Sequence, residues 1–220
     1  MDAPLLTCRP TTNAHWPSDG AVDWVVLLHG LFATRQSMRK LEQRLLETGY
    51  SVLNWGYPTF LRTTGQHVQR LIPTLEQMQA DPRVRSINFV THSMGGILVR
   101  CALHLTALSK VRRVVMLAPP NRGSHLTRIS LGPFAWCVPT IADLSEAPDS
   151  LPNRLRVPKS VEFGVIAASR DLVVRVANTA LPDQRDHTTL CLTHFSLPKH
   201  EKTVQMVKCF LATGRFAAAA

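Results

Sequence analysis

The chain has 220 residues, of which 45% are hydrophobic and 18% charged, a globular composition with the length of one domain. Its net charge of +10 is spread without a long basic tract, which argues against specific nucleic-acid binding and leaves weak contact with anionic interfaces open. No apolar run reaches the ~18–20 residues of a transmembrane segment. Five scattered cysteines with no metal-binding spacing, and a start without a long apolar core, favour a cytoplasmic protein without a signal peptide.

Short apolar runs alternate with segments of helical periodicity from residue 22 onward. The apolar runs predict strands at residues 22–28, 50–55, 85–91, 111–118, 161–168 and 188–193. The periodic segments predict helices at residues 35–48, 66–80, 94–109 and 199–213. Strands that are apolar throughout are buried on both faces, so this alternation predicts an α/β fold with a doubly wound, mostly parallel sheet of about six strands.

Residues 119–158 separate the fourth and fifth predicted strands. The segment holds seven prolines and has weak helical periodicity, and connections of this kind usually need only ~2–6 residues. We therefore expect a cap-like insertion within a single domain that spans residues 1–220. Phe134 and Trp136 in this insertion are expected to contact an apolar part of a substrate.

The segment around Ser93 has the order strand, sharp turn, helix. The letters Thr91-His-Ser-Met-Gly-Gly96 follow the third predicted strand and open a helix, which is the setting of a nucleophile elbow. Gly95 and Gly96 leave room where the strand and the helix crowd together. The backbone N–H of Met94 lies at a helix N-terminus, where it can donate to an oxyanion. An ordinary strand–helix turn with a serine cap is the alternative interpretation.

Two motifs together resemble the α/β-hydrolase superfamily. Val25-Val-Leu-Leu-His-Gly30-Leu-Phe32 and Thr91-His-Ser-Met-Gly-Gly96 are similar to segments of small bacterial lipases and esterases of the triacylglycerol-lipase-like group. The similarity extends through Ala118-Pro-Pro-Asn-Arg-Gly-Ser124 to the closing Phe210–Phe216 segment. The resemblance implies a minimal α/β-hydrolase fold and a serine nucleophile at residue 93. It also implies a second oxyanion donor after His29-Gly30, from the backbone N–H of Leu31 or Phe32, with the His29 side chain in a structural role.

In the family that this chain resembles, the general base is a histidine late in the chain. His194 follows the last predicted strand and can reach the elbow serine from a loop. His200 is expected in the first turn of the last helix, and His187 ahead of the strand, at the wrong end of the sheet. His92 adjoins the serine, but its side chain is expected to point away from the nucleophile.

The acid is expected between the serine and the histidine, directly after the fifth strand. Asp171 occupies that place and matches the aspartate of the resembled family. Asp183 and Asp186 are the competitors, although their loop leads into the base of the next strand and suits turn or cap roles better. The task of Asp171 is to fix the tautomer of His194 and to stabilise the imidazolium.

These residues predict a serine hydrolase that cleaves a small-molecule ester or lipid substrate. Substrate contacts are expected from Phe32 and from the insertion, and Arg122 is a candidate for contact with a head group, against a solvated loop in which Ser124 caps a short helix. No metal site or cofactor motif is recognised. An acyltransferase or thioesterase with the same residues, or a non-catalytic binding protein on the same scaffold, remains an alternative.

Overall fold

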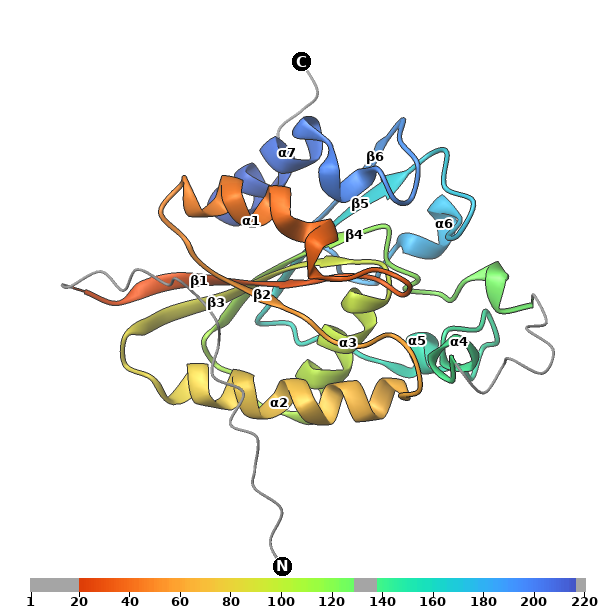
Figure 1. Cartoon of the computed structure of the whole chain (residues 1–220), viewed down its shortest axis with the longest axis horizontal. Helices are drawn as coiled ribbons and strands as arrows, with labels where there is room; N and C mark the ends of the chain where they lie inside the picture. Colours follow the sequence, from red (N-terminus) through yellow and green to blue (C-terminus); the bar gives the residue numbers. More distant parts are fainter. Residues whose placement is uncertain (1–19, 129–137, 217–220) are drawn as a thin grey trace, which may run out of the picture.

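Six strands form one sheet in the computed structural model, which describes residues 20–128 and 138–216 (Figure 1). The strands lie in the order β2-β1-β3-β4-β5-β6, and every neighbouring pair is parallel. The strand bounds are Val22–Leu28, Ser51–Trp55, Val84–His92, Val111–Leu117, Glu162–Ala168 and Asp186–Leu190 for β1 to β6. The predicted α/β fold is therefore confirmed, with a sheet that is parallel throughout.

Helices cover both faces of the sheet, as the apolar strands require. Figure 1 shows α1 (Arg39–Leu46) and α7 (Glu201–Thr213) on one face and α2 (Thr64–Ala80) and α3 (Met94–Leu105) on the other. Each face has its own buried cluster. On the first face, Leu41, Leu45, Val207 and Phe210 pack against the strands. On the second face, the packing residues include Val68, Leu71, Ile97 and Leu98.

The predicted helices differ from the observed ones mainly at their ends. The predicted helix 35–48 is a 3-10 turn, Arg35–Met38, followed by α1. The predicted helix 199–213 is a 3-10 turn, Leu197–Lys199, followed by α7. α2 starts earlier than predicted, at a capping box between Thr63 and Gln66.

The sixth strand runs over Asp186–Leu190, so the predicted span 188–193 was wrong at both ends. Its pairing with β5 begins at Asp186 and ends at Leu190. After Leu190 the chain turns sharply, because the N–H of Leu192 bonds back to the carbonyl of Leu190. Cys191, inside the predicted strand, is exposed at that turn.

The long connection between β4 and β5 carries only short helices in the part that is described. These are a 3-10 turn at His125–Arg128, α4 (Thr140–Asp143) and α5 (Leu151–Arg154). Phe134 and Trp136 lie outside the described residues. A further short helix, α6 (Val176–Thr179), follows β5.

The strand order reverses at β1, which lies between β2 and β3 although it precedes both in sequence. Loops leave such a switch point in opposite directions, and open parallel sheets bind ligands there, outside the carboxyl ends of the strands. β1 ends at Leu28 and β3 at His92. The residues that follow, His29-Gly30 and Ser93, therefore stand where a site is expected.

Candidate active site

Ser93 occupies a strained turn between β3 and α3. Its φ of 51° and ψ of −123° lie in a region that non-glycine residues rarely adopt. Neighbouring glycines make the turn possible. A Cβ atom at Gly95 would lie 2.7 Å from the carbonyl oxygen of Leu28, and one at Gly30 would lie 3.0 Å from Cβ of Ser93. The first strand, its following loop and the serine turn are thus in close contact.

Backbone donors are available on two segments next to this turn. Met94 is the first residue of α3, and the first N–H groups of a helix have no acceptor within the helix. The segment Leu31-Phe32 follows β1 on the other side, with Phe32 in a left-handed conformation (φ 57°) and its side chain 56% exposed. These are the two places from which the sequence predicts oxyanion donors.

The His29 side chain bonds to backbone groups in the loops that follow β1 and β2. Its Nδ1 donates to the carbonyl of Gly30 at 2.9 Å, and its Nε2 accepts from the N–H of Tyr57 at 3.4 Å. The ring stacks on Tyr57 with centroids 4.2 Å apart, and the Tyr57 hydroxyl donates to the His29 carbonyl. Burial lowers the pKa of His29, so the neutral ring is favoured.

His194 and Asp171 meet at the carboxyl end of the sheet, after β6 and β5. Nδ1 of His194 donates to Oδ2 of Asp171 at 2.7 Å, and the two side chains are 5% and 1% exposed. The other carboxylate oxygen, Oδ1, accepts from the N–H groups of Val173 and Val174 at 2.7 and 2.8 Å. Burial alone would raise the pKa of Asp171, but the bonds from His194 and the two N–H groups outweigh it, and the pKa is lowered.

His92 joins the serine turn to the histidine loop. Its Nε2 donates to the backbone carbonyl of His194 at 3.0 Å, and the two rings lie 4.7 Å apart. Burial lowers the pKa of His92 to about 3, so the ring is neutral. Within the described residues no hydrogen bond joins the Ser93 hydroxyl to His194. Hydrogen bonds between catalytic groups often tighten only when substrate is bound.

The competing histidines are engaged elsewhere. His200 caps α7, where its Nδ1 accepts from the N–H of Lys202 at 3.2 Å. His187 lies inside β6 rather than ahead of it, and its Nε2 is 2.9 Å from the hydroxyl of Thr179. The expectation that His187 precedes the strand was wrong because β6 begins at Asp186.

The competing carboxylates have structural surroundings. Oδ2 of Asp186 accepts from the N–H of Phe216 at 2.7 Å, which ties the end of the chain to the first residue of β6. Asp183 is exposed in the preceding turn, with a φ of 59°. Neither carboxylate has a hydrogen bond to a histidine ring in the described structure.

Residues 121–124 are more firmly held than a solvated loop. The Arg122 side chain is exposed, but Ser124 is buried, and its hydroxyl donates to the carbonyl of Val173 in the loop after β5. Asn121 accepts from the buried Arg100 of α3. Sequence reasoning missed this use of Ser124 and Arg100 because their partners are distant in sequence.

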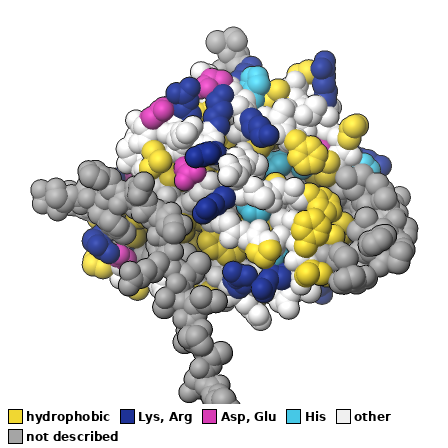
Figure 2. Space-filling view, in the orientation of Figure 1, with side chains coloured by type: hydrophobic (Ala, Val, Ile, Leu, Met, Phe, Trp, Pro, Cys, Tyr) yellow, Lys and Arg dark blue, Asp and Glu magenta, His cyan; other side chains and the backbone are white. Residues whose placement is uncertain are grey.

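Apolar side chains surround the carboxyl end of the sheet. Five of the seven large hydrophobic side chains that are exposed in the described structure lie in loops at this end: Phe32, Phe60, Leu61, Leu172 and Phe195. Figure 2 shows hydrophobic side chains gathered beside histidine on this side of the molecule. A hollow of about 350 Å³ lies between Phe32 and Phe195 and reaches His92. Apolar surface gathered in this way is typical of a binding site.

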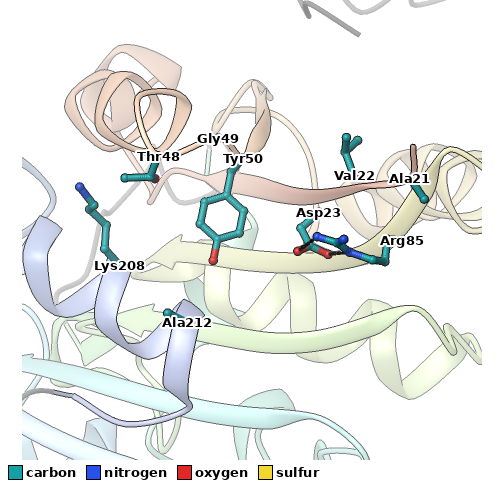
Figure 3. Close-up of a pocket in the computed structure, with 9 residues that line it drawn as sticks. All are labelled: Ala21, Val22, Asp23, Thr48, Gly49, Tyr50, Arg85, Lys208 and Ala212. Carbon is teal, nitrogen blue, oxygen red and sulfur yellow. Dashed lines mark hydrogen bonds and ion pairs between the residues drawn. The ribbon is translucent and has the colours of Figure 1, made fainter. Parts of the chain in front are cut away.

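A second hollow, of about 450 Å³, lies at the opposite end of the sheet (Figure 3). It is lined by the first residues of β1, by Tyr50, by Arg85 of β3 and by α7. Asp23 is paired there with Arg85, whose hydrogen bonds lower the pKa of Asp23 against the effect of burial. The described lining residues include no serine, cysteine or histidine.

Residues 20–128 and 138–216 hold neither a metal-binding cluster nor a membrane-spanning helix. No group of three or more His, Cys, Asp or Glu side chains in these ranges could hold a metal ion. No helix there combines the length and apolarity that crossing a bilayer requires.

A family model described as "Domain of unknown function (DUF7379)" matches residues 6–131. The chain belongs to this family. The match covers the first strand, the serine turn and the fourth strand, and it ends before Asp171 and His194. No curated protein matches the chain.

Solved structures with the same fold include lipases and esterases. The mature lipase BlEst2 of Bacillus licheniformis has a TM-score of 0.69 and 17% identity over 88% of this chain and 92% of its own. Est1E of Butyrivibrio proteoclasticus has a TM-score of 0.64 and 16% identity over 88% of each chain. Phospholipase PlaB of Legionella pneumophila has a TM-score of 0.58 and 18% identity over 72% of this chain and 45% of its own. The chain therefore has the α/β-hydrolase fold of lipases and esterases.

Proposed function

We propose that the protein is a serine hydrolase that cleaves carboxylic esters through an acyl-enzyme on Ser93. The observation that carries the proposal is the buried pair of His194 and Asp171. A hydrogen bond from His92 joins the loop of His194 to the strained turn at Ser93. The shared fold with lipases and esterases supports the same class of reaction. A buried histidine–carboxylate pair beside an elbow serine is the arrangement that acyl transfer needs.

The hydrogen bond to Asp171 determines which nitrogen of His194 is available. Because Nδ1 donates to the carboxylate, Nε2 is unprotonated in the neutral ring and can accept a proton. As the Ser93 oxygen bonds to the acyl carbon, Nε2 takes the hydroxyl proton. It then returns this proton to the departing alcohol when the ester C–O bond breaks. Water repeats the two steps on the acyl-enzyme and releases the acid.

The negative charge on the carbonyl oxygen requires fixed donors. We assign this role to the backbone N–H of Met94, at the start of α3, and to the N–H of Leu31 in the loop after β1. Backbone donors at a helix start suit an oxyanion because they need no reorganisation when the charge develops. The close contact of Gly30 with Ser93 supports a position for the Leu31 loop beside the nucleophile.

The substrate class is an ester with an apolar acyl chain, or a lipid. The apolar side chains at the carboxyl end of the sheet support this, since Phe32 and Phe195 border the hollow that reaches His92. We place Phe134, Trp136 and the rest of the insertion along the acyl chain as well, with Arg122 at the mouth. The net charge of +10 suits weak contact with anionic interfaces.

The test is labelling with a fluorophosphonate probe together with hydrolysis of p-nitrophenyl esters of graded acyl length. The wild-type protein should be labelled and should release p-nitrophenol, and Ser93→Ala should do neither. Because the Ser93→Ala protein retains Ser124 and Ser196, its labelling would reveal a reaction at either of them, and none is expected. Absence of labelling in the folded wild type would contradict the proposal and favour a non-catalytic binding protein. Faster turnover of thioesters, or transfer to an added alcohol, would favour a thioesterase or an acyltransferase.

A further inference from the structure

Asp171 is held by a peptide group that is itself held from outside the loop. The peptide group between Val173 and Val174 offers its N–H to Oδ1 of Asp171 at 2.8 Å. Its carbonyl, which belongs to Val173, accepts from the hydroxyl of Ser124 at 2.5 Å. Both ends of one planar group are therefore occupied, one by the acid and one by Ser124.

We propose that Ser124 is a positioning residue for the catalytic acid, acting through the peptide group between Val173 and Val174. The inference rests on the proposed function, in which Asp171 orients His194. The hydroxyl, the peptide group, the carboxylate and the imidazole form one chain of three hydrogen bonds: 2.5 Å at the Ser124 end, 2.8 Å at the carboxylate and 2.7 Å at His194. A donor to the carbonyl polarises the peptide and strengthens its N–H as a donor to the carboxylate.

Burial makes this series of hydrogen bonds sensitive to the loss of any one of its groups. Ser124 is 6% exposed, Val174 is 1% exposed, and the Asp171 side chain is 1% exposed. Among such buried neighbours, removal of the hydroxyl would leave the Val173 carbonyl without that donor. If the Val173 carbonyl turns toward another donor, the peptide plane rotates. That rotation moves the N–H of Val174, which holds Oδ1 of Asp171.

Ser124 is itself fixed by backbone contacts on both sides. Its N–H donates to the carbonyl of Leu144 at 2.8 Å. Gly123 precedes it with a φ of +89°, and a Cβ atom there would lie 2.2 Å from the carbonyl oxygen of Ser145. The Gly123 carbonyl accepts from the amide of Asn178, which is in α6. The hydroxyl therefore has a defined position relative to the loop after β5.

Arg100 fixes the start of the same segment. This side chain is 2% exposed, and it donates to the carbonyl and side-chain oxygens of Asn121 and to the carbonyls of Pro152 and Leu155. It joins the helix that begins at the serine turn to both ends of the insertion. The segment 121–124 is thus bonded to the helix that begins at Ser93, to a later part of the insertion and to the loop of Asp171. Ser124 is the residue in it whose hydroxyl reaches the peptide group that holds Asp171.

The test compares Ser124→Ala with a matched control, Ser86→Ala. Ser86 is 8% exposed and also donates from its hydroxyl, to Asp23 at 2.6 Å, but it lies at the other end of the sheet. Both variants should lower Tm by similar amounts. Ser124→Ala should lower kcat roughly tenfold with less than about a twofold change in KM, whereas Ser86→Ala should leave both near wild type. Ser124→Thr, which keeps the donor, should restore most of kcat.

Two readouts separate positioning from general damage. The low-field proton resonance of the bond between His194 and Asp171, identified by its loss in Asp171→Asn, should shift in Ser124→Ala and stay in place in Ser86→Ala. In the Asp171→Asn background, Ser124→Ala should cause no further loss of kcat, because the two act through one chain.

An unshifted resonance with unchanged kcat in Ser124→Ala would overturn the proposal, as would additive losses in the double variant. An equal loss of kcat in Ser124→Thr and Ser124→Ala would also contradict it. The resonance requires no turnover. A protein that hydrolyses no ester therefore refutes the proposed function while the shift still tests the link from Ser124 to Asp171.

Discussion

Asp171→Asn should reduce ester hydrolysis on the order of 10⁴-fold in kcat, and the structure indicates why. The N–H groups of Val173 and Val174 both point at Oδ1, so the amide side chain of this variant would keep its oxygen on that side. Its NH₂ group would then face Nδ1 of His194, which would have to accept. The imidazole proton would move to Nε2, where it blocks proton transfer from Ser93. The reference value comes from the serine-protease aspartate, and 10⁴ corresponds to roughly 5–6 kcal/mol of barrier.

The assay is the steady-state rate of hydrolysis of a short p-nitrophenyl ester. The far-ultraviolet circular dichroism spectrum and Tm check that each variant is folded. Asp186→Asn is the control, because that carboxylate accepts from the N–H of Phe216 and has no histidine-ring partner in the described structure. It should alter Tm more than kcat. An Asp171→Asn protein that keeps activity within about tenfold of wild type, while Asp183→Asn or Asp186→Asn loses it, would refute the assignment of the acid.

Four further predictions concern the catalytic unit, the effect of pH on activity, the effect of pH on stability, and the insertion. Ser93→Ala and His194→Ala should each lower kcat by several orders of magnitude, and steady-state assays of the double variant should find it little worse than either single variant. Ester hydrolysis measured across pH should fall on the acid side, because only a neutral imidazole can accept the serine proton. A rate that does not change between about pH 5 and pH 9 would argue against a histidine base. The free energy of unfolding in urea should also fall between about pH 6.5 and pH 4. Burial lowers the pKa of His92 to about 3 and that of His67 to about 4, so the unfolded chain takes up protons that the folded protein does not. Trp136→Ala should slow hydrolysis of long-chain esters more than of acetate esters, and equal losses for both would place Trp136 away from the acyl chain.

The apolar side chains at the carboxyl end of the sheet and the buried histidines together surround Ser93. His29 bonds through both ring nitrogens to backbone groups of Gly30 and Tyr57, and His92 bonds through Nε2 to the carbonyl of His194. Burial favours the neutral form of both rings. Each ring therefore bonds to a loop at the carboxyl end of the sheet without adding a second charge near His194. A neutral surrounding of this kind keeps the carboxylate of Asp171 as the main fixed charge beside the imidazole.

The sequence by itself determined the layers, the parallel class of the sheet and the position of the turn at Ser93. Strands such as Val22–Leu28 and Val111–Leu117 are largely apolar runs, and a run of this kind is buried between two layers of helices whatever its neighbours are. The serine turn was equally local, because Ser93 and its two glycines are close together in the chain. The strand ends were less well determined. Asp186 and His187 are polar residues that pair with β5 only because the sheet edge offers them partners.

Tertiary structure alone decided how the loops at the carboxyl end of the sheet are held. The Ser124 hydroxyl donates to the peptide group that supports Asp171, although Ser124 lies 49 positions away from Val173. Arg100 of α3 donates to the backbone of the insertion. Neither residue belongs to a local pattern, since hydrogen-bonding groups are matched by distance in space and not by spacing in sequence. Hydrophobic periodicity records which residues are buried, but it does not record which buried polar atom finds which partner.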